Sequence, residues 1–137
     1  WPPALPPDTG KCALHDELND ASLVFKMTFG RMSFLVTGDI SRRSEEALIK
    51  SGRNLRADLL FVPHHGSVHS SSEDFLTAVS PRYALVSAGR NNIFGHPHRK
   101  VLQRYLSRDI TVMRTDRHGA ITIRSSGSHL RVVSTRQ

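Results

Sequence analysis

The sequence predicts a mixed α/β fold built of packed layers, and two patterns along the chain lead to this prediction. An alternating apolar stretch at residues 22–29 and an apolar run at 32–37 flank a tight turn, as the strands of a β-hairpin do. Further along, short apolar runs alternate with segments of helical periodicity, which is typical of layered α/β domains. The length of 137 residues suffices for one compact domain with its own core.

The first strand is predicted at 22–29 because its larger apolar side chains recur at every second position. We therefore expect one face of this strand to be firmly buried, namely the face of Leu23, Phe25, Met27 and Phe29. Gly30 and Arg31 supply the tight turn, and the returning strand ends at Gly38 and Asp39.

Three helices are predicted from their first turns. The segment 41–50 begins with charged residues and places Glu45 near the positive end of the helix dipole. Ser70 and Glu73 have the spacing of a capping box for the second helix. Pro97 suits the first position of the third helix. Further strands are predicted between and after these helices, at 58–62, 83–87, 110–114, 120–124 and 130–133.

The composition restricts the classes of function. Lys and Arg number 19 against 12 Asp and Glu, a formal charge of +7 that favours an anionic partner such as nucleic acid, acidic lipid or a phosphorylated substrate. Solubility alone is the alternative reason for this charge. The single cysteine, Cys12, excludes an internal disulfide and a multi-cysteine metal site. Apolar runs of about five residues are too short to cross a bilayer, which takes roughly 20, so the chain is expected to be soluble.

The domain organisation is predicted from where proline is concentrated. Residues 1–20 are expected to be an irregular, Pro-rich lead-in, and residues 21–137 to form the folded part. Because the sequence starts at Trp1 rather than at a methionine, we expect it to be a fragment of a longer protein.

Three predicted strand ends carry side chains that bind metals. Asp39 follows the second strand, His64 and His65 follow the third, and His96 lies in a loop after the fourth. Carboxylate oxygen and imidazole nitrogen suit zinc and manganese. Asp39 suits a helix N-cap equally well, and both interpretations stay open at this stage. Successive side chains in an extended segment diverge, so at least one histidine of the pair is expected to be functional.

Five motifs occur in an order and spacing that point to a known family. They lie at residues 19–24, 34–39, 62–67, 92–97 and 114–119. Together they closely resemble the C-terminal half of the metallo-β-lactamase-like domain in the ComEC family of DNA-uptake channel proteins, over roughly residues 15–124. The resemblance implies half of an αββα sandwich, with a mixed sheet and helices on one face.

The resemblance also implies roles for individual residues. Asp39 would bridge two divalent ions, Zn or Mn, in the complete domain, and His64 or His65 would supply a further ligand. His96 would grip substrate phosphate or assist proton transfer, so that Asp39, His65 and His96 are the candidate catalytic residues. Positions expected to line the site without binding metal are Asn19, Ser22, Ser67 and Asn92.

The departure from the family pattern concerns the main ligand motif. The His-x-His-x-Asp-His sequence of the first half does not occur in these 137 residues. Asp39 and one histidine are two ligands, whereas a catalytic zinc normally has three protein ligands. The chain by itself is therefore expected to bind metal weakly or not at all and to be a poor catalyst.

The function implied is metal-dependent hydrolysis of phosphodiesters, which in this family would degrade the DNA strand that is not transported. Two alternatives stay open: a non-catalytic module for DNA docking or channel assembly, and a metallohydrolase acting on another phosphodiester. The domain would lie on the periplasmic or extracellular side of a cell-membrane protein.

The partners implied are the DNA backbone, single- or double-stranded, and the membrane channel portion of the same protein. A homodimer through an exposed sheet face is a further expectation. Only Phe94 is an aromatic near the predicted cleft, so backbone contacts without sequence preference are expected in place of base stacking. Candidate contacts to phosphates are Arg42, Arg43, Arg90, Arg99 and Lys100.

Overall fold

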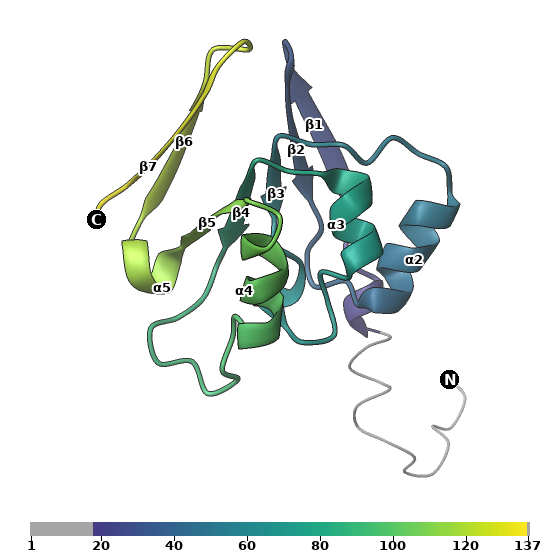
Figure 1. Cartoon of the computed structure of the whole chain (residues 1–137), viewed down its shortest axis with the longest axis horizontal. Coiled ribbons are helices and arrows are strands. Elements are labelled where there is room, and N and C mark those ends of the chain that lie inside the picture. The colour runs from purple at the N-terminus through teal and green to yellow at the C-terminus, as the bar shows by residue number, and fades with distance from the viewer. Residues whose placement is uncertain (1–17, 137) are drawn as a thin grey trace, which may run out of the picture.

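The computed structural model describes residues 18–136, so Cys12 and residues 1–17 of the predicted lead-in lie outside the described residues. Residues 18–20 of that lead-in are helical and not irregular. In chain order the strands are β1 (Phe25–Phe29), β2 (Met32–Val36), β3 (Leu59–Phe61), β4 (Tyr83–Val86), β5 (Thr111–Arg114), β6 (Ile121–Ser125) and β7 (Leu130–Ser134). The helices are α2 (Arg42–Lys50), α3 (Glu73–Val79), α4 (Arg99–Leu106) and α5 (Thr115–His118), with a 3₁₀ turn η1 at Pro63–Gly66. Mixed α/β architecture is thus confirmed (Figure 1).

A five-stranded mixed sheet in the order β1-β2-β3-β4-β5 forms the centre of the molecule. The β1–β2 hairpin is antiparallel, as predicted, and β2 to β5 run parallel to one another. Parallel pairing requires a crossover between strands, and α2, α3 and α4 supply these crossovers on one face of the sheet (Figure 1). The predicted sheet with helices on one face is therefore present.

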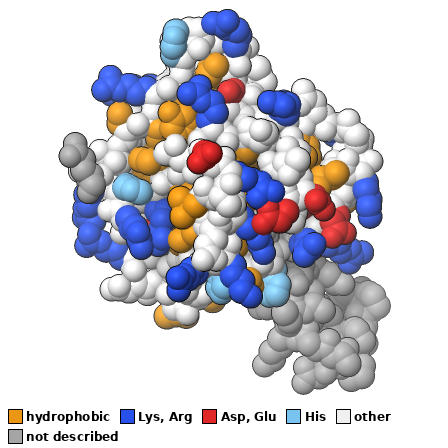
Figure 2. Space-filling view, in the orientation of Figure 1, with side chains coloured by type: hydrophobic (Ala, Val, Ile, Leu, Met, Phe, Trp, Pro, Cys, Tyr) orange, Lys and Arg blue, Asp and Glu red, His pale blue; other side chains and the backbone are white. Residues whose placement is uncertain are grey.

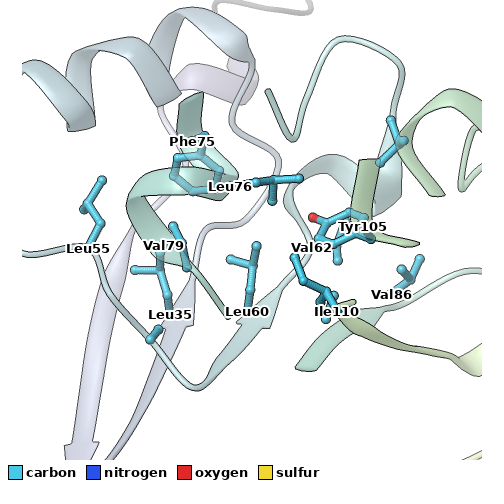
Figure 3. Packing of buried hydrophobic residues seen from close by; sticks show 13 residues of the cluster. Leu35, Leu55, Leu60, Val62, Phe75, Leu76, Val79, Val86, Tyr105 and Ile110 are labelled. Atoms are coloured by element: carbon cyan, nitrogen blue, oxygen red, sulfur yellow. The ribbon is translucent and has the colours of Figure 1, made fainter. Parts of the chain in front are cut away.

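The main core lies between the sheet and these three helices. Sheet residues such as Leu35 and Leu60 contact Phe75 and Val79 of α3 and Tyr105 of α4 (Figure 3). Tyr105 is fully buried, and its hydroxyl lies 2.9 Å from Ser71 Oγ, which satisfies its one polar atom. Burial raises the pKa of this phenol above its usual range. None of the helices within residues 18–136 is long and apolar enough to cross a membrane.

The hairpin β6–β7 covers the opposite face of the sheet. Phe34, Leu59 and Leu85 point to this side and form a second, smaller core with apolar residues of the hairpin. Figure 1 shows the hairpin on the side away from the helices. The two hairpins meet at their tips, where Arg31 N–H donates to Gly127 O at 2.6 Å.

The prediction of a firmly buried face on the first strand is wrong. All five residues of β1 are exposed, and Met27 retains 52% of its surface. Met27 is paired with Phe34 and therefore points to the same side as the β6–β7 hairpin. Because β1 is the edge strand, that hairpin covers β2 to β4 and meets β1 only near the turn.

Two of the predicted helix starts are shifted. Ser72 caps α3 by accepting from Phe75 N–H, because the hydroxyl of Ser70 donates instead to Pro63 O and Ser67 O. His98 caps α4 by accepting from Lys100 N–H, so Pro97 lies before the helix and not at its first position.

Glu45 lies in the first turn of α2, as predicted, and its side chain is turned into the protein. Its carboxylate is fully buried and accepts hydrogen bonds from Ser71 N–H and, at 2.8 Å, from Ser72 N–H. These bonds tie α2 to the start of α3. Burial raises the pKa of Glu45, although the two backbone donors oppose this effect.

Candidate active site

The ends of the parallel strands bring the three predicted motifs to one edge of the sheet. Asp39 follows β2, the histidine pair forms η1 after β3, and the loop 87–98 follows β4. Carboxyl ends of parallel strands lie at the same edge, where ligand sites of α/β proteins form. Backbone bonds join the three segments, because His64 N–H donates to Gly38 O and His98 N–H donates to Gly66 O.

The backbone of the histidine pair is strained. His64 (φ 49°) and His65 (φ 54°) both adopt the left-handed conformation, and Gly66 follows at φ 83°. Such a conformation costs a non-glycine residue about 1–3 kcal/mol and occurs most often at functional sites. The two imidazoles thus diverge through a left-handed turn, and not through the pleat of an extended strand. A Cβ on Gly66 would lie 2.6 Å from Pro97 Cβ, so glycine allows the two loops to approach.

His65 and Asp39 face each other with the spacing of two ligands of one metal ion. His65 Nδ1 lies 2.7 Å from Ser87 O. Because a carbonyl oxygen only accepts, Nδ1 carries a proton, and Nε2 is the ring nitrogen left to bind a metal ion. Nε2 lies 3.5 Å from Asp39 Oδ1, beyond the usual length of a strong hydrogen bond. Two ligands at about 2.1 Å from a tetrahedral ion lie about 3.4 Å apart.

The His65 hydrogen bond to a backbone carbonyl is also typical of metal-binding histidines, where it fixes the tautomer and orients the ring. Within residues 18–136, however, no group of three or more His, Cys, Asp or Glu side chains is placed to hold a metal ion. Asp39 and His65 therefore fit part of a coordination shell, and further ligands would have to come from outside the described residues.

Asp39 does not cap α2, so the interpretation of this residue as a helix N-cap is wrong. Ser41 is the N-cap, and its hydroxyl accepts from Arg43 N–H. The Asp39 side chain is partly exposed toward His65, while its N–H donates to Ser22 Oγ at 3.1 Å. Ser22 thus supports the loop that carries the carboxylate.

Three aromatic rings continue the site beyond His65. The His64 ring meets the His96 ring edge-on, with centroids 5.8 Å apart, and His96 lies nearly parallel to Phe94 at 6.0 Å and 23°. Nδ1 of His64 and Nδ1 of His96 are buried without a hydrogen-bond partner among the described residues. Buried polar atoms are usually paired, so these two nitrogens mark a place suited to a polar ligand.

The predicted lining residues have different positions. Ser22 is beside Asp39, and Asn92 shapes the loop after β4 by bonding His96 N–H and His96 O. Ser67 is buried, and its hydroxyl accepts from His69 N–H inside the turn. Asn19 forms a local turn before Ser22, since its carbonyl accepts from Ser22 N–H.

The predicted phosphate contacts form two exposed groups near this edge. Arg42 and Arg43 begin α2, and Arg90, Arg99 and Lys100 surround the loop between β4 and α4. Figure 2 shows Lys and Arg side chains distributed over the visible face, including its lower edge, where Figure 1 places this loop. Arg42 also pairs with Glu46, four residues later.

Two contacts near the site were not predicted from the sequence. Asp20 accepts from Ser41 N–H and Ser44 Oγ–H and so ties the segment before β1 to α2. The carbonyl of Ser87 orients His65. Asp20 adjoins Asn19 within a motif already noted, whereas a backbone carbonyl leaves no mark in the sequence.

The pKa of His96 is expected to lie below the usual range of histidine. Burial, followed by repulsion from the imidazoles of His64 and His65, lowers its pKa. A lowered pKa means that the unfolded chain takes up this proton first, so stability falls as the pH drops through the usual histidine pKa of about 6.5. NMR titration should give the His96 imidazole a midpoint below the usual histidine pKa of about 6.5. A midpoint at or above this value would contradict the prediction.

Comparisons with known proteins find similar curated proteins, whereas no family model matches the chain. The chain is 43% identical over 106 residues to ComE operon protein 3 of Bacillus subtilis (strain 168), covering 77% of the chain and 14% of that protein. It is 43% identical over 104 residues to Competence protein ComA of Neisseria gonorrhoeae, covering 75% and 15%. It is 36% identical over 124 residues to Uncharacterized protein YcaI of Escherichia coli (strain K12), covering 90% and 16%. The chain thus spans about one seventh of the length of these curated relatives.

Proposed function

The chain belongs, as a segment, to a ComEC-type competence (DNA-uptake) family, and from this membership we propose that it contributes a metal-dependent phosphodiester hydrolase site to DNA uptake. The reaction would cut the DNA strand that is not transported, next to a membrane channel formed by the rest of the protein. The observation that carries the proposal is the Asp39–His65 pair, held at 3.5 Å with His65 Nδ1 bound to Ser87 O.

The donor set suits the chemistry of such a site. A bound zinc or manganese ion lowers the pKa of a bound water and stabilises charge on the leaving oxygen. Asp39 and His65 would hold this ion on one side, together with ligands from outside residues 18–136. His96, whose pKa is lowered by burial, would hydrogen bond a phosphate oxygen or transfer a proton.

The two adjacent histidines are expected to respond differently to substitution. His65→Ala should lower metal affinity and kcat/KM by at least about 100-fold, because even outer partners of metal ligands contribute 10–100-fold. His64→Ala should keep metal affinity, since the His64 ring lies against His96 and not against Asp39. Isothermal titration with manganese and a nuclease assay on the full-length protein test this difference. Equal losses of affinity in both variants would contradict it.

A second candidate is a non-catalytic module for DNA docking or channel assembly. The observations that favour it are the formal charge of +7 and the lack of a three-ligand group in the described residues. Such a module would bind DNA through the backbone, with affinity falling steeply as salt rises. Full-length protein that binds DNA in this manner but cuts neither single- nor double-stranded DNA with manganese or zinc would favour this candidate over the hydrolase.

A further inference from the structure

We infer that Phe94 is a stacking platform for an unpaired base, so that the nucleic acid bound beside Asp39 and His65 is single-stranded. This inference rests on the proposed function and specifies its substrate class. Phe94 lines the cleft that contains His65 and keeps 74% of its surface exposed, whereas its neighbour Ile93, 91% exposed, is not among the lining residues. Ligand clefts are lined mainly by apolar and aromatic side chains, so the Phe94 ring is a candidate ligand contact.

The loop that carries Phe94 is held in place by its own hydrogen bonds. Asn92 Nδ2 donates to Gly89 O and to His96 O, and Asn92 Oδ1 accepts from His96 N–H. Gly95 takes a left-handed conformation at φ 66° and donates its N–H to Asn92 O. The exposed ring is therefore presented by an ordered turn, which lowers the entropy lost when a ligand stacks on it.

The cleft beside Phe94 also contains the candidate metal ligand. A hollow of about 250 Å³ is lined by Phe94, His96, Asn92, Ser87 and His65. Pockets that enclose whole drug-sized ligands measure about 300–1,000 Å³. This smaller hollow has room for roughly one nucleobase with its sugar. A nucleotide placed here would bring its phosphate toward His65 while its base lies against Phe94.

The orientation of the ring suits a base. Phe94 stands nearly parallel to His96, with 23° between the ring planes, and most of the Phe94 ring is open to solvent. Every base has an aromatic face, so stacking on Phe94 would not depend on sequence. The exposed cations Arg90, Arg99 and Lys100 near the same loop suit the phosphates that follow.

Stacking on Phe94 selects for unpaired substrate. In a duplex both faces of an internal base are covered by neighbouring bases, and freeing a base requires unstacking it. With only one aromatic near the cleft, the sequence predicts backbone contacts in place of base stacking. One ring is enough for one base at the cut position, whereas a row of aromatics is needed only for binding along many nucleotides.

The test measures binding of the full-length protein to a short oligothymidylate that contains one 2-aminopurine, in EDTA so that no strand is cut. Phe94→Ala should weaken this binding by about 5- to 150-fold, the range for loss of one stacked base, and should abolish the quenching of 2-aminopurine. Phe94→Trp should retain both signals. The matched control is Ile93→Ala, a change of the more exposed neighbour in the same loop, which should behave as wild type. Binding to a blunt duplex should be the same for all variants.

Several outcomes would overturn the inference: wild-type quenching in Phe94→Ala, full retention of binding in Phe94→Leu, or an equal loss of duplex binding. If wild type and Phe94→Ala cut single strands with manganese at the same KM, the stacking inference is also overturned. The proposed hydrolase function would stand in that case. If wild type cuts no DNA, the proposed hydrolase fails, and the binding result still decides whether Phe94 stacks on a base.

Discussion

Replacing Asp39 with alanine is expected to abolish metal-dependent hydrolysis of DNA by the full-length protein while leaving the fold intact. The change removes the carboxylate that faces His65 Nε2 at 3.5 Å, and with it one of the two metal donors that this chain places together. We expect kcat/KM to fall by about 100-fold or more, beyond the effect of losing an outer-shell partner. Manganese affinity should fall in parallel, measured by calorimetry.

The fold should tolerate this substitution because Asp39 has no structural task that alanine cannot perform. Its side chain is partly exposed, Ser41 is the cap of α2, and the backbone bond to Ser22 Oγ does not need the carboxylate. The matched control is Asp74→Ala, which removes an exposed carboxylate in the first turn of α3. Full activity in the Asp39 variant, or equal loss in the control, would remove Asp39 from the site.

Glu45→Ala is expected to cause the largest loss of stability among single changes in α2. The carboxylate is fully buried and accepts from the N–H groups of Ser71 and Ser72 at the start of α3. Alanine would leave both donors buried without a partner, and each such group costs about 1–3 kcal/mol. Urea denaturation of this chain should therefore show a loss of about 2–6 kcal/mol in the free energy of unfolding.

Glu46→Ala, at the next position in the same helix, is the control. Glu46 is exposed and pairs with Arg42 at 3.5 Å across one helical turn. Such surface pairs contribute about 0.3–0.5 kcal/mol. A Glu45 variant no less stable than the Glu46 variant would show that the buried carboxylate does not hold α2 and α3 together.

The sequence predicted which strand ends carry the site residues, but not how their side chains are arranged. Apolar runs placed Asp39, His64, His65 and His96 after strands, and parallel strands bring such ends to one edge. The sequence could not distinguish His64 from His65, because the left-handed turn of η1 and the carbonyl of Ser87 decide which ring faces Asp39. That carbonyl lies 22 residues away along the chain.

The pattern of apolar and polar residues along the chain determined the hairpin, the strands and the approximate positions of the helices. Residues that share a face are set by the two-residue period of a strand or the 3.6-residue period of a helix, and these periods are visible in the sequence. Tertiary structure alone decided whether a face is covered: it left Met27 of β1 exposed and turned Glu45 inward. The physical reason is that burial depends on partners distant in sequence, such as the β6–β7 hairpin over Phe34 and the start of α3 over Glu45.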